Sequence, residues 1–214
     1  MKDIPVFSCP DGIATLILRE IPFRGEGYIL VRGVFGTPEG LLAECAGFCR
    51  AAGAERLFAA GEADFSGYLP AIRILARSAP RASLLPAPES VRLVPVTEET
   101  AADWAREYNA RFLAVPAAES CSPAEERALA AGGEAVWIED GAERIGLGRV
   151  RGSELLAVAA LQPGAGERCV RALAARCAGP EIRLTCAAEN GRAMRLYDRL
   201  GFSRGAEERV WFSI

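Results

Sequence analysis

Two strand-to-helix turns in the C-terminal third of the chain carry the residue types that could do chemistry. In the first, Gln162 to Glu167 (QPGAGE) follows the apolar segment 155–161 and precedes an amphipathic segment. Glycines in such a turn let the backbone approach a pyrophosphate, whose charge is met by free N–H groups and the positive end of the helix. In the second, Asn190 precedes a helical segment in which Tyr197 lies two turns on, on nearly the same face. Together the turns favour a ligand with a nucleotide tail.

Each feature also has an ordinary structural explanation. A Gly-x-Gly sequence is common in turns, Asn190 is a good N-cap, and a tyrosine beside an apolar helix stripe is usually a core residue.

The chain contains no histidine, which excludes His-based triads, His metal ligands and His acid–base catalysis. Chemistry must therefore use Tyr, Glu, Asp, Cys, Lys or backbone groups, and we expect no metal site.

Bulk properties exclude several classes of protein. The net charge of −3 and the absence of a Lys/Arg run argue against nucleic acid as a partner. No apolar stretch is long enough to span a membrane, and the N-terminal residues lack the apolar core of a signal peptide. Seven cysteines without a CxxC pair indicate small buried side chains in a reducing compartment. We therefore expect a cytoplasmic globular protein.

A proline-containing segment at 78–90 divides the chain. We place an N-terminal α/β domain at residues 1–80, a linker at 81–90 and a second domain at 91–214. In the second domain, local patterns predict strand, helix, helix, three strands, helix, strand, helix and strand. The sequence Ser122 to Glu125 has the form of a capping box, and Asp140-Gly141 predicts a hairpin. The fold class is α/β, a mixed twisted sheet with helices on both faces.

The N-terminal domain contains a strand, a helix and a strand with nearly the same spacing. The span from Val31 to Glu55 matches that from Val158 to Glu181. We interpret it as a degenerate half-repeat that lacks the Gly-x-Gly turn. Coincidence is the alternative, because strand–helix–strand units are common. The segment 68–78 (YLPAIRILARS) is read as a further helix.

The residues from Leu155 to Phe202, taken in order, resemble the C-terminal half of GNAT-type N-acetyltransferases. The resemblance covers residues 91–214 in element order, and NGRAMRLYDRLGF is its most specific part. The matching residues are Leu156, Ala157, Val158, Gly164, Gly166, Asn190, Ala193, Leu196, Tyr197, Leu200, Gly201 and Phe202.

The resemblance implies that acetyl-CoA binds as co-substrate between the strands at 155–161 and 182–187, which splay apart. Backbone groups of Leu156 and Val158 would pair with the pantetheine arm, and the Val158 N–H would polarise the thioester carbonyl. Asn190 would contact the same arm. The pyrophosphate would lie on the backbone amides of Gly164, Ala165, Gly166, Glu167 and Arg168.

The resemblance also implies direct attack of an amine on the thioester. The Tyr197 hydroxyl would protonate the departing CoA thiolate, a role that suits a phenol. Glu154 is the candidate general base, because it starts the central strand with the parity of family bases, although at another offset. Two alternatives stay open: Glu154 is a solvated strand-end carboxylate, or water or an already neutral amine makes a base unnecessary.

The chain departs from the family pattern at three places. Pro163 stands where the family usually has Arg or Gln, and Arg168 where it has Gly or Ala. Arg168 would either crowd the helix start or add a phosphate contact. The chain ends after one strand where many family members add another, and we expect a strand from the N-terminal part to fill that edge.

We therefore expect an N-acetyltransferase that moves an acetyl group from acetyl-CoA to a primary amine of a small-molecule or peptide acceptor. The alternative is a non-catalytic acyl-CoA-binding module, a sensor or structural partner, which Pro163, Arg168 and the missing base favour. Transfer of a longer acyl chain is a third reading. Homodimers are frequent in such families, so a homodimer is compatible with the resemblance. Neither nucleic acid nor a membrane is expected as a partner.

Overall fold

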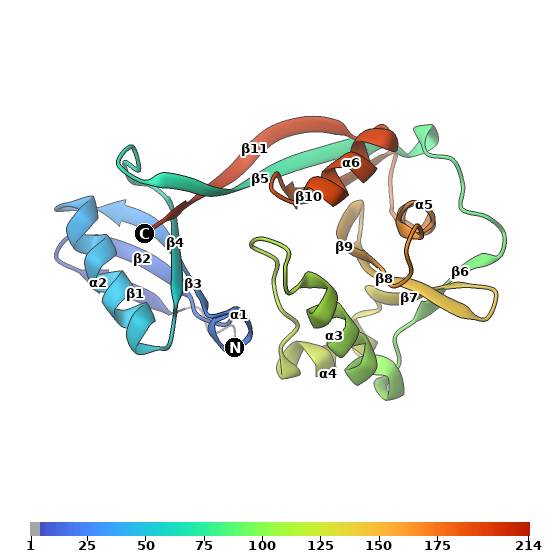
Figure 1. Cartoon of the computed structure of the whole chain (residues 1–214), viewed down its shortest axis with the longest axis horizontal. Helices are drawn as coiled ribbons and strands as arrows, with labels where there is room; N and C mark the ends of the chain where they lie inside the picture. The colour runs from blue at the N-terminus through green and yellow to red at the C-terminus, as the bar shows by residue number, and fades with distance from the viewer. Residues whose placement is uncertain (1–4) are drawn as a thin grey trace. The chain divides into compact units, whose positions relative to one another are not determined.

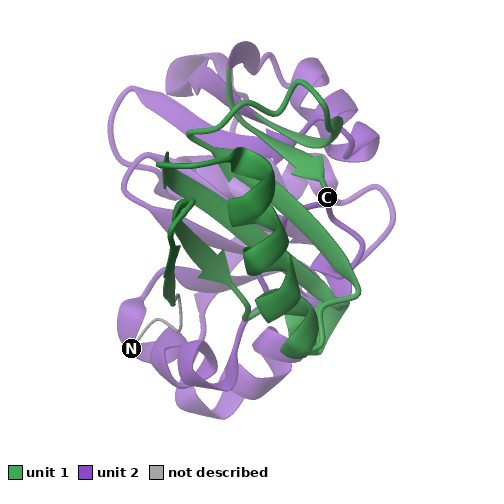
Figure 2. Cartoon of the chain, turned by 90° about the vertical axis from the view of Figure 1, so that its left-hand side faces the viewer, with its two compact units in different colours: residues 1–74, 207–214 green, residues 75–206 purple. Residues whose placement is uncertain are grey.

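The computed structural model describes residues 5–214, and the chain divides into two compact units (Figures 1 and 2). Unit 1 comprises Met1–Ile74 and Glu207–Ile214, and unit 2 comprises Leu75–Ala206. Two long strands pass from one unit to the other: β5, Leu69–Pro80, ends in unit 2, and β11, Ser203–Ser213, ends in unit 1. The domain boundaries predicted from the sequence stay a prediction.

Unit 1 contains the predicted strand–helix–strand. β3 and β4 are parallel neighbours paired over six residues, from Glu26↔Arg56 to Val31↔Gly61. The helix α2 packs one apolar face on this sheet, with Leu41, Cys45 and Cys49 fully buried. The strand order is β1-β2-β3-β4-β11. The elements are β1 (Val6–Cys9), β2 (Gly12–Ile17), α1 (Ile21–Arg24), β3 (Glu26–Val34), α2 (Pro38–Ala51) and β4 (Arg56–Gly61).

Unit 2 has the element order predicted for residues 91–214. Its strand order is β11-β5-β10-β9-β8-β7-β6, a mixed sheet in which β9 and β10 are parallel. After β5 and the short 3-10 helix η1 (Arg81–Ser83), the elements are β6 (Val91–Pro95), α3 (Glu98–Phe112), α4 (Pro123–Gly132), β7 (Ala135–Asp140), β8 (Glu143–Arg151), β9 (Glu154–Ala160), α5 (Gly166–Arg176), β10 (Glu181–Ala187) and α6 (Gly191–Arg199). Among the described residues, no helix has the length and apolarity that crossing a bilayer requires.

Helices cover both faces of the sheet in unit 2. Neighbouring residues of β7 contribute to different cores, Trp137 to one and Ile138 to the other, as the alternation of a strand requires. The core of Trp137 contains residues of α3 and α4, such as Trp104 and Leu129. The core of Ile138 contains residues of α5 and α6, among them Tyr197. The predicted architecture of a mixed sheet between helices is confirmed.

Local signals placed most boundaries in unit 2 correctly. The capping box is present: the Ser122 N–H donates to Glu125 Oε2 at 2.9 Å, and the Glu125 N–H donates to Ser122 Oγ at 3.3 Å. The hairpin at Asp140-Gly141 joins β7 to β8, and Gly141 adopts a φ of 61°. These signals act over three or four residues, so they need no tertiary context.

The helix expected at 68–78 is wrong, because Leu69–Pro80 forms strand β5. The apolar residues Ile72, Leu75 and Ala79 fit a helix face, but an apolar segment buried in a sheet fits them equally well. The segment forms a strand because it lies between β10 and β11, which offer hydrogen-bond partners to its backbone on both sides. The expectation that a strand from the N-terminal part completes the C-terminal sheet is thereby confirmed.

Candidate active site

A gap between two parallel strands defines the candidate site. β9 and β10 pair at Arg183↔Glu154, where the Arg183 N–H donates to the Ser153 carbonyl at 2.9 Å, and at no later position among the described residues. The corresponding strands of unit 1, β3 and β4, stay paired over six residues. Beyond Glu154 the backbone groups of β9 and β10 that face each other therefore form no hydrogen bonds between the two strands. An extended ligand with amide groups could pair with these groups.

A β-bulge in β9 lies just beyond the last pair. Against β8, Ala157 pairs with Arg149 and Leu155 pairs with Val150, so Leu156 has no partner residue. Such a bulge bends the strand and increases its twist, which carries β9 away from β10. Leu156 is 39% exposed in an otherwise apolar strand. The bulge is the local cause to which we attribute the gap.

The backbone of Val158 faces the gap. The Leu161 N–H donates to the Ile145 carbonyl of β8 at 2.8 Å. Because backbone groups alternate in direction along a strand, Ala159 also faces β8, whereas Val158 and Ala160 direct their N–H and C=O groups to the β10 side. The Val158 amide is therefore a donor that pairs with no described residue of β10, two residues beyond the bulge, where the sequence predicted a donor to a carbonyl oxygen.

The turn before α5 leaves the helix N-terminus open. Gly164 has a φ of 81°, a conformation that favours glycine. A Cβ at Gly166 would lie 3.2 Å from Leu196 Cδ2, so this glycine lets α5 start close to α6. The N-cap residue is Ala165, and no side chain caps the helix. The first N–H groups, those of Gly166, Glu167 and Arg168, are thus available to an anion.

The two charged side chains of this turn have partners of their own. Arg168 Nη1 pairs with Asp140 Oδ2 at the β7–β8 hairpin, and Glu167 Oε1 lies 2.5 Å from Arg171 Nη2. The Arg168 guanidinium therefore neither crowds the helix start nor points freely to a phosphate. Because Arg171 neutralises Glu167, the carboxylate adds little repulsion to an anion at the helix end.

Asn190 performs the ordinary capping role and keeps a free donor. Its Oδ1 accepts a hydrogen bond from the Ala193 N–H at 3.2 Å. Its Nδ2 forms no hydrogen bond to any described residue, so two N–H groups remain for a ligand. The capping alternative and the ligand role predicted from the sequence are thus compatible.

Tyr197 lies in the core of unit 2, 7% exposed, with its ring centroid 5.5 Å from that of Phe202. Its hydroxyl forms no hydrogen bond to a described residue. Burial, and then the nearby Cys186, raise the pKa of Tyr197 above its ordinary value, while Arg77 opposes the shift. The phenol is therefore protonated at neutral pH, as a proton donor must be.

Glu154 lies at the opposite end of the gap from the chemistry. It is exposed and belongs to the last residue pair between β9 and β10. Four residues of strand separate it from Val158, a distance of about 13 Å. Beyond the pair, β9 leads through Val158 to the open N-terminus of α5, and β10 leads to Asn190 and the helix of Tyr197, whereas Glu154 stays at the paired end.

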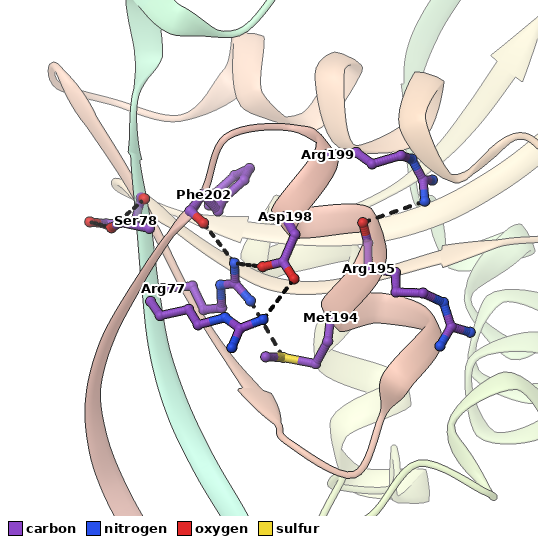
Figure 3. Close-up of polar contacts among 9 residues, drawn as sticks. Arg77, Ser78, Met194, Arg195, Asp198, Arg199 and Phe202 are labelled. Carbon is purple, nitrogen blue, oxygen red and sulfur yellow. Dashed lines mark hydrogen bonds and ion pairs between the residues drawn. The ribbon is translucent and has the colours of Figure 1, made fainter.

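Sequence reasoning missed one residue beside the site, Arg77 of β5. Its side chain is fully buried and bonds to Asp198 and to the Phe202 carbonyl, next to Tyr197 (Figure 3). The signal available was an arginine within an apolar segment, IRILARSA. Only a strand assignment would have turned that arginine into a candidate buried cation.

The equivalent turn of unit 1 is filled by the protein itself. The Asp11 Oδ1 atom accepts a hydrogen bond from the Thr37 N–H at 2.8 Å, before the first turn of α2. A Cβ at Gly36 or Gly40 would overlap this carboxylate. With paired strands and an internal anion at the helix end, unit 1 lacks both features that define the gap in unit 2.

No protein-family model matches the chain, and no curated protein matches it. Solved structures do. A functionally unknown conserved protein from Staphylococcus epidermidis ATCC 12228 has a TM-score of 0.60 at 11% identity, over 100% of this chain and 94% of that one. A GCN5-related N-acetyltransferase from Sphaerobacter thermophilus has a TM-score of 0.54 at 16% identity, and the match covers 95% of this chain and 76% of that one. A tandem GNAT protein from the clavulanic acid biosynthesis pathway has a TM-score of 0.52 at 12% identity, and the match covers 95% of this chain and 78% of that one.

The chain therefore has the fold of the GNAT-type N-acetyltransferases, as the resemblance in its sequence predicted. The segments β9-α5-β10 and β3-α2-β4 are both strand–helix–strand units, and each first strand carries a β-bulge, but only β9 and β10 part after one residue pair. That the N-terminal unit is a degenerate half-repeat stays a prediction. At these identities the comparison defines the fold, and the function has to be argued from the site.

Proposed function

We propose that the protein is an N-acetyltransferase that uses acetyl-CoA as co-substrate and a primary amine as acceptor. The observation that carries the proposal is the bulged gap between β9 and β10, which opens where Val158 presents an unpaired amide. The uncapped N-terminus of α5 follows β9, and α6, which carries the protonated phenol, follows β10. Fold likeness to named acetyltransferases supports the proposal.

Each part of the gap has a role in this reaction. The amide groups of the pantetheine arm pair with the backbone of β9, and the pyrophosphate accepts hydrogen bonds from the Gly166–Arg168 amides. The Val158 N–H donates to the thioester oxygen and stabilises the negative charge that develops there. The amine nitrogen attacks the thioester carbon, the C–S bond breaks, and Tyr197 gives its proton to the departing sulfur. The Asn190 Nδ2 group donates to the pantetheine arm.

The attacking amine must lose a proton. Glu154 lies at the paired end of the gap, so we propose that the amine arrives neutral or passes its proton to water. We also propose that Tyr197 regains its proton from solvent after the products leave. This choice makes Glu154 dispensable, a consequence that substitution tests.

A second candidate, a non-catalytic acyl-CoA-binding module, is favoured by one observation. Pro163 supplies neither an N–H nor the polar side chain that the family usually has there, and Arg168 does not replace it because Asp140 engages its guanidinium. The two candidates agree on ligand binding and differ on turnover.

Calorimetric titration with acetyl-CoA, with desulfo-CoA as a control for the thiol end, tests binding. Binding in the micromolar range is expected, and no binding at millimolar concentration contradicts both candidates. Release of free thiol with a panel of a polyamine, an aminoglycoside, an α-amino acid and a peptide N-terminus tests turnover. Thiol release that depends on one amine supports the enzyme, whereas tight binding without release supports the module.

We also propose a cytoplasmic location. All seven cysteines are free, and six of them are buried. Burial raises the pKa of the Cys169 and Cys186 thiols to about 11, which makes these thiols inert at neutral pH. Inert free thiols suit a reducing compartment, where acetyl-CoA is also consumed as a substrate.

A further inference from the structure

Arg77 is a fully buried cation whose contacts all lie on one helix or just beyond it. From β5 its Nη2 atom donates to Asp198 Oδ1 at 2.5 Å and to the Phe202 carbonyl at 2.6 Å (Figure 3). Its Nη1 atom lies 3.6 Å from Met194 Sδ. Met194 and Asp198 belong to α6, and Phe202 follows its C-terminus. One side chain of a distant strand therefore holds the last turn of α6.

A buried arginine at this place is costly to the fold. Removing a guanidinium from water carries a desolvation penalty that one ion pair offsets only in part. Its carboxylate partner is 39% exposed and is shared with Arg204, at 3.0 Å. The Arg77 Nε atom is buried and forms no hydrogen bond to any residue that the structure describes. An apolar side chain would fill the core at lower cost, so the arginine is better explained by the geometry that it imposes.

That geometry surrounds Tyr197. Asp198 is the next residue in the chain, Met194 lies three residues earlier on the same helix face, and the Phe202 ring contacts the Tyr197 ring. Hydrogen bonds to Asp198 and to Phe202 restrict both rotation and axial movement of the helix at Tyr197. The phenol, which forms no hydrogen bond of its own to a described residue, depends on this backbone for its position.

We propose that Arg77 is a positioning residue for Tyr197, supplied to the active site by the strand that the N-terminal part of the chain contributes. This inference rests on the proposed function for its effect on catalysis. It makes acetyl transfer in unit 2 depend on β5, which lies before the predicted linker in the sequence.

The chain offers a matched control in Arg81, which follows β5 directly. Its Nη1 atom donates to the Cys177 carbonyl and its Nη2 atom to the Ala175 carbonyl, both at 3.0 Å, at the C-terminal end of α5. Arg81 is thus another arginine of the same segment that holds a helix end. Its helix does not carry Tyr197.

The test compares Arg77→Met, Arg77→Lys and Arg81→Met in the wild-type and Tyr197→Phe backgrounds. Thiol release from acetyl-CoA is measured with the amine that gives the highest rate in the panel. We expect Arg77→Met to lower kcat about 10- to 100-fold with KM for acetyl-CoA within about twofold. Arg77→Lys recovers part of the loss, because lysine keeps the charge without the fork. Arg81→Met changes kcat less than about twofold.

The Tyr197→Phe background separates positioning from general damage. If Arg77 acts through the phenol, Arg77→Met has no further effect on kcat once the hydroxyl is gone. Independent, multiplying effects of the two substitutions overturn the inference, and so does an equal loss in Arg81→Met. Should Arg77→Met fail to fold, Asp198→Asn removes the charge from the other end of the pair and is expected to lower kcat in the same direction.

A second readout keeps the inference separate from the proposed function. Amide hydrogen exchange of residues 194–202 is expected to rise in Arg77→Met and to stay unchanged in Arg81→Met. Unchanged exchange in Arg77→Met shows that the arginine does not hold the helix. If the wild-type protein transfers acetyl to no amine, the proposed function fails, while the exchange data still decide the anchoring role.

Discussion

The Asp11 carboxylate accepts a hydrogen bond from the Thr37 N–H at 2.8 Å, at the helix end that corresponds to the open N-terminus of α5 in unit 2. The same carboxylate occupies the space beside Gly36 and Gly40. In unit 1 the Thr37 side chain caps the helix, through a hydrogen bond from the Gly40 N–H at 3.1 Å, and the Asp11 carboxylate lies beside that cap, whereas no side chain caps α5 in unit 2. Under the proposed function, this difference assigns ligand binding to unit 2 and not to unit 1.

Replacement of Asp11 by alanine should therefore affect stability without affecting binding. We expect the free energy of unfolding to fall by about 0.5–1.5 kcal/mol, the usual net contribution of one hydrogen bond. Asp11→Asn, which keeps an acceptor oxygen, should lose less. Urea denaturation measures the first effect. Calorimetry should give an unchanged affinity for acetyl-CoA, and a weakened affinity would contradict the assignment of the ligand to unit 2.

Replacement of Tyr197 by phenylalanine should remove the proton donor and little else. We expect kcat to fall by about 10²-fold or more, the usual contribution of a general acid, with KM for acetyl-CoA unchanged. Because the hydroxyl forms no hydrogen bond to a described residue, the melting temperature should change little. Steady-state kinetics and calorimetry on the same preparation check both points. An unchanged kcat would exclude Tyr197 as the acid.

Replacement of Gly164 by alanine should weaken the phosphate turn. The φ of 81° strains any residue with a Cβ, although a Cβ there would meet no atom within 4 Å. We expect a loss of about 1 kcal/mol in stability and weaker binding of acetyl-CoA. Gly132→Ala is the matched control, because its Cβ would also meet nothing and its φ is ordinary. Equal effects of the two substitutions would show that the conformation of Gly164 is not needed.

Replacement of Glu154 by glutamine should leave turnover nearly unchanged. The residue lies at the paired end of the gap, about 13 Å of strand from Val158. We expect kcat to change less than about threefold, and the acidic limb of the pH–rate profile to keep its position. A loss of two orders of magnitude, together with loss of that limb, would restore Glu154 as the general base.

Tyr108 predicts a pH dependence of stability. Burial raises its pKa to about 12 in the folded protein, whereas a tyrosine in the unfolded chain has a pKa of about 10. Above about pH 10 the Tyr108 hydroxyl loses its proton in the unfolded state but keeps it in the folded state. The free energy of unfolding therefore keeps its full contribution from this group below about pH 10 and declines as the pH rises towards about 12. Urea denaturation at pH 9 and pH 11 should show a smaller decline in Tyr108→Phe than in the wild type. Equal declines would contradict the shift.

Much of the candidate site could be predicted from local sequence. The Gly164 turn, the Asn190 cap and the position of Tyr197 follow from signals within a few residues, and the element order of unit 2 follows from periodicity and caps. These features are decided by neighbours in the chain, so they do not depend on how the chain folds back on itself.

Tertiary structure alone decided the rest. Residues 69–80 have an apolar pattern that suits a helix or a buried strand, and only the vacancy between β10 and β11 selects the strand. The gap depends on the register of β9 against β8, and the roles of Arg77 and Asp11 depend on partners 121 and 26 residues away. The sequence by itself determined the elements from β6 onward and, apart from Arg77, the candidate residues of the site. Long-range pairing determined the strand at 69–80, the place where β9 and β10 part and what holds the helix of Tyr197, because those free energies come from contacts between segments that local sequence does not connect.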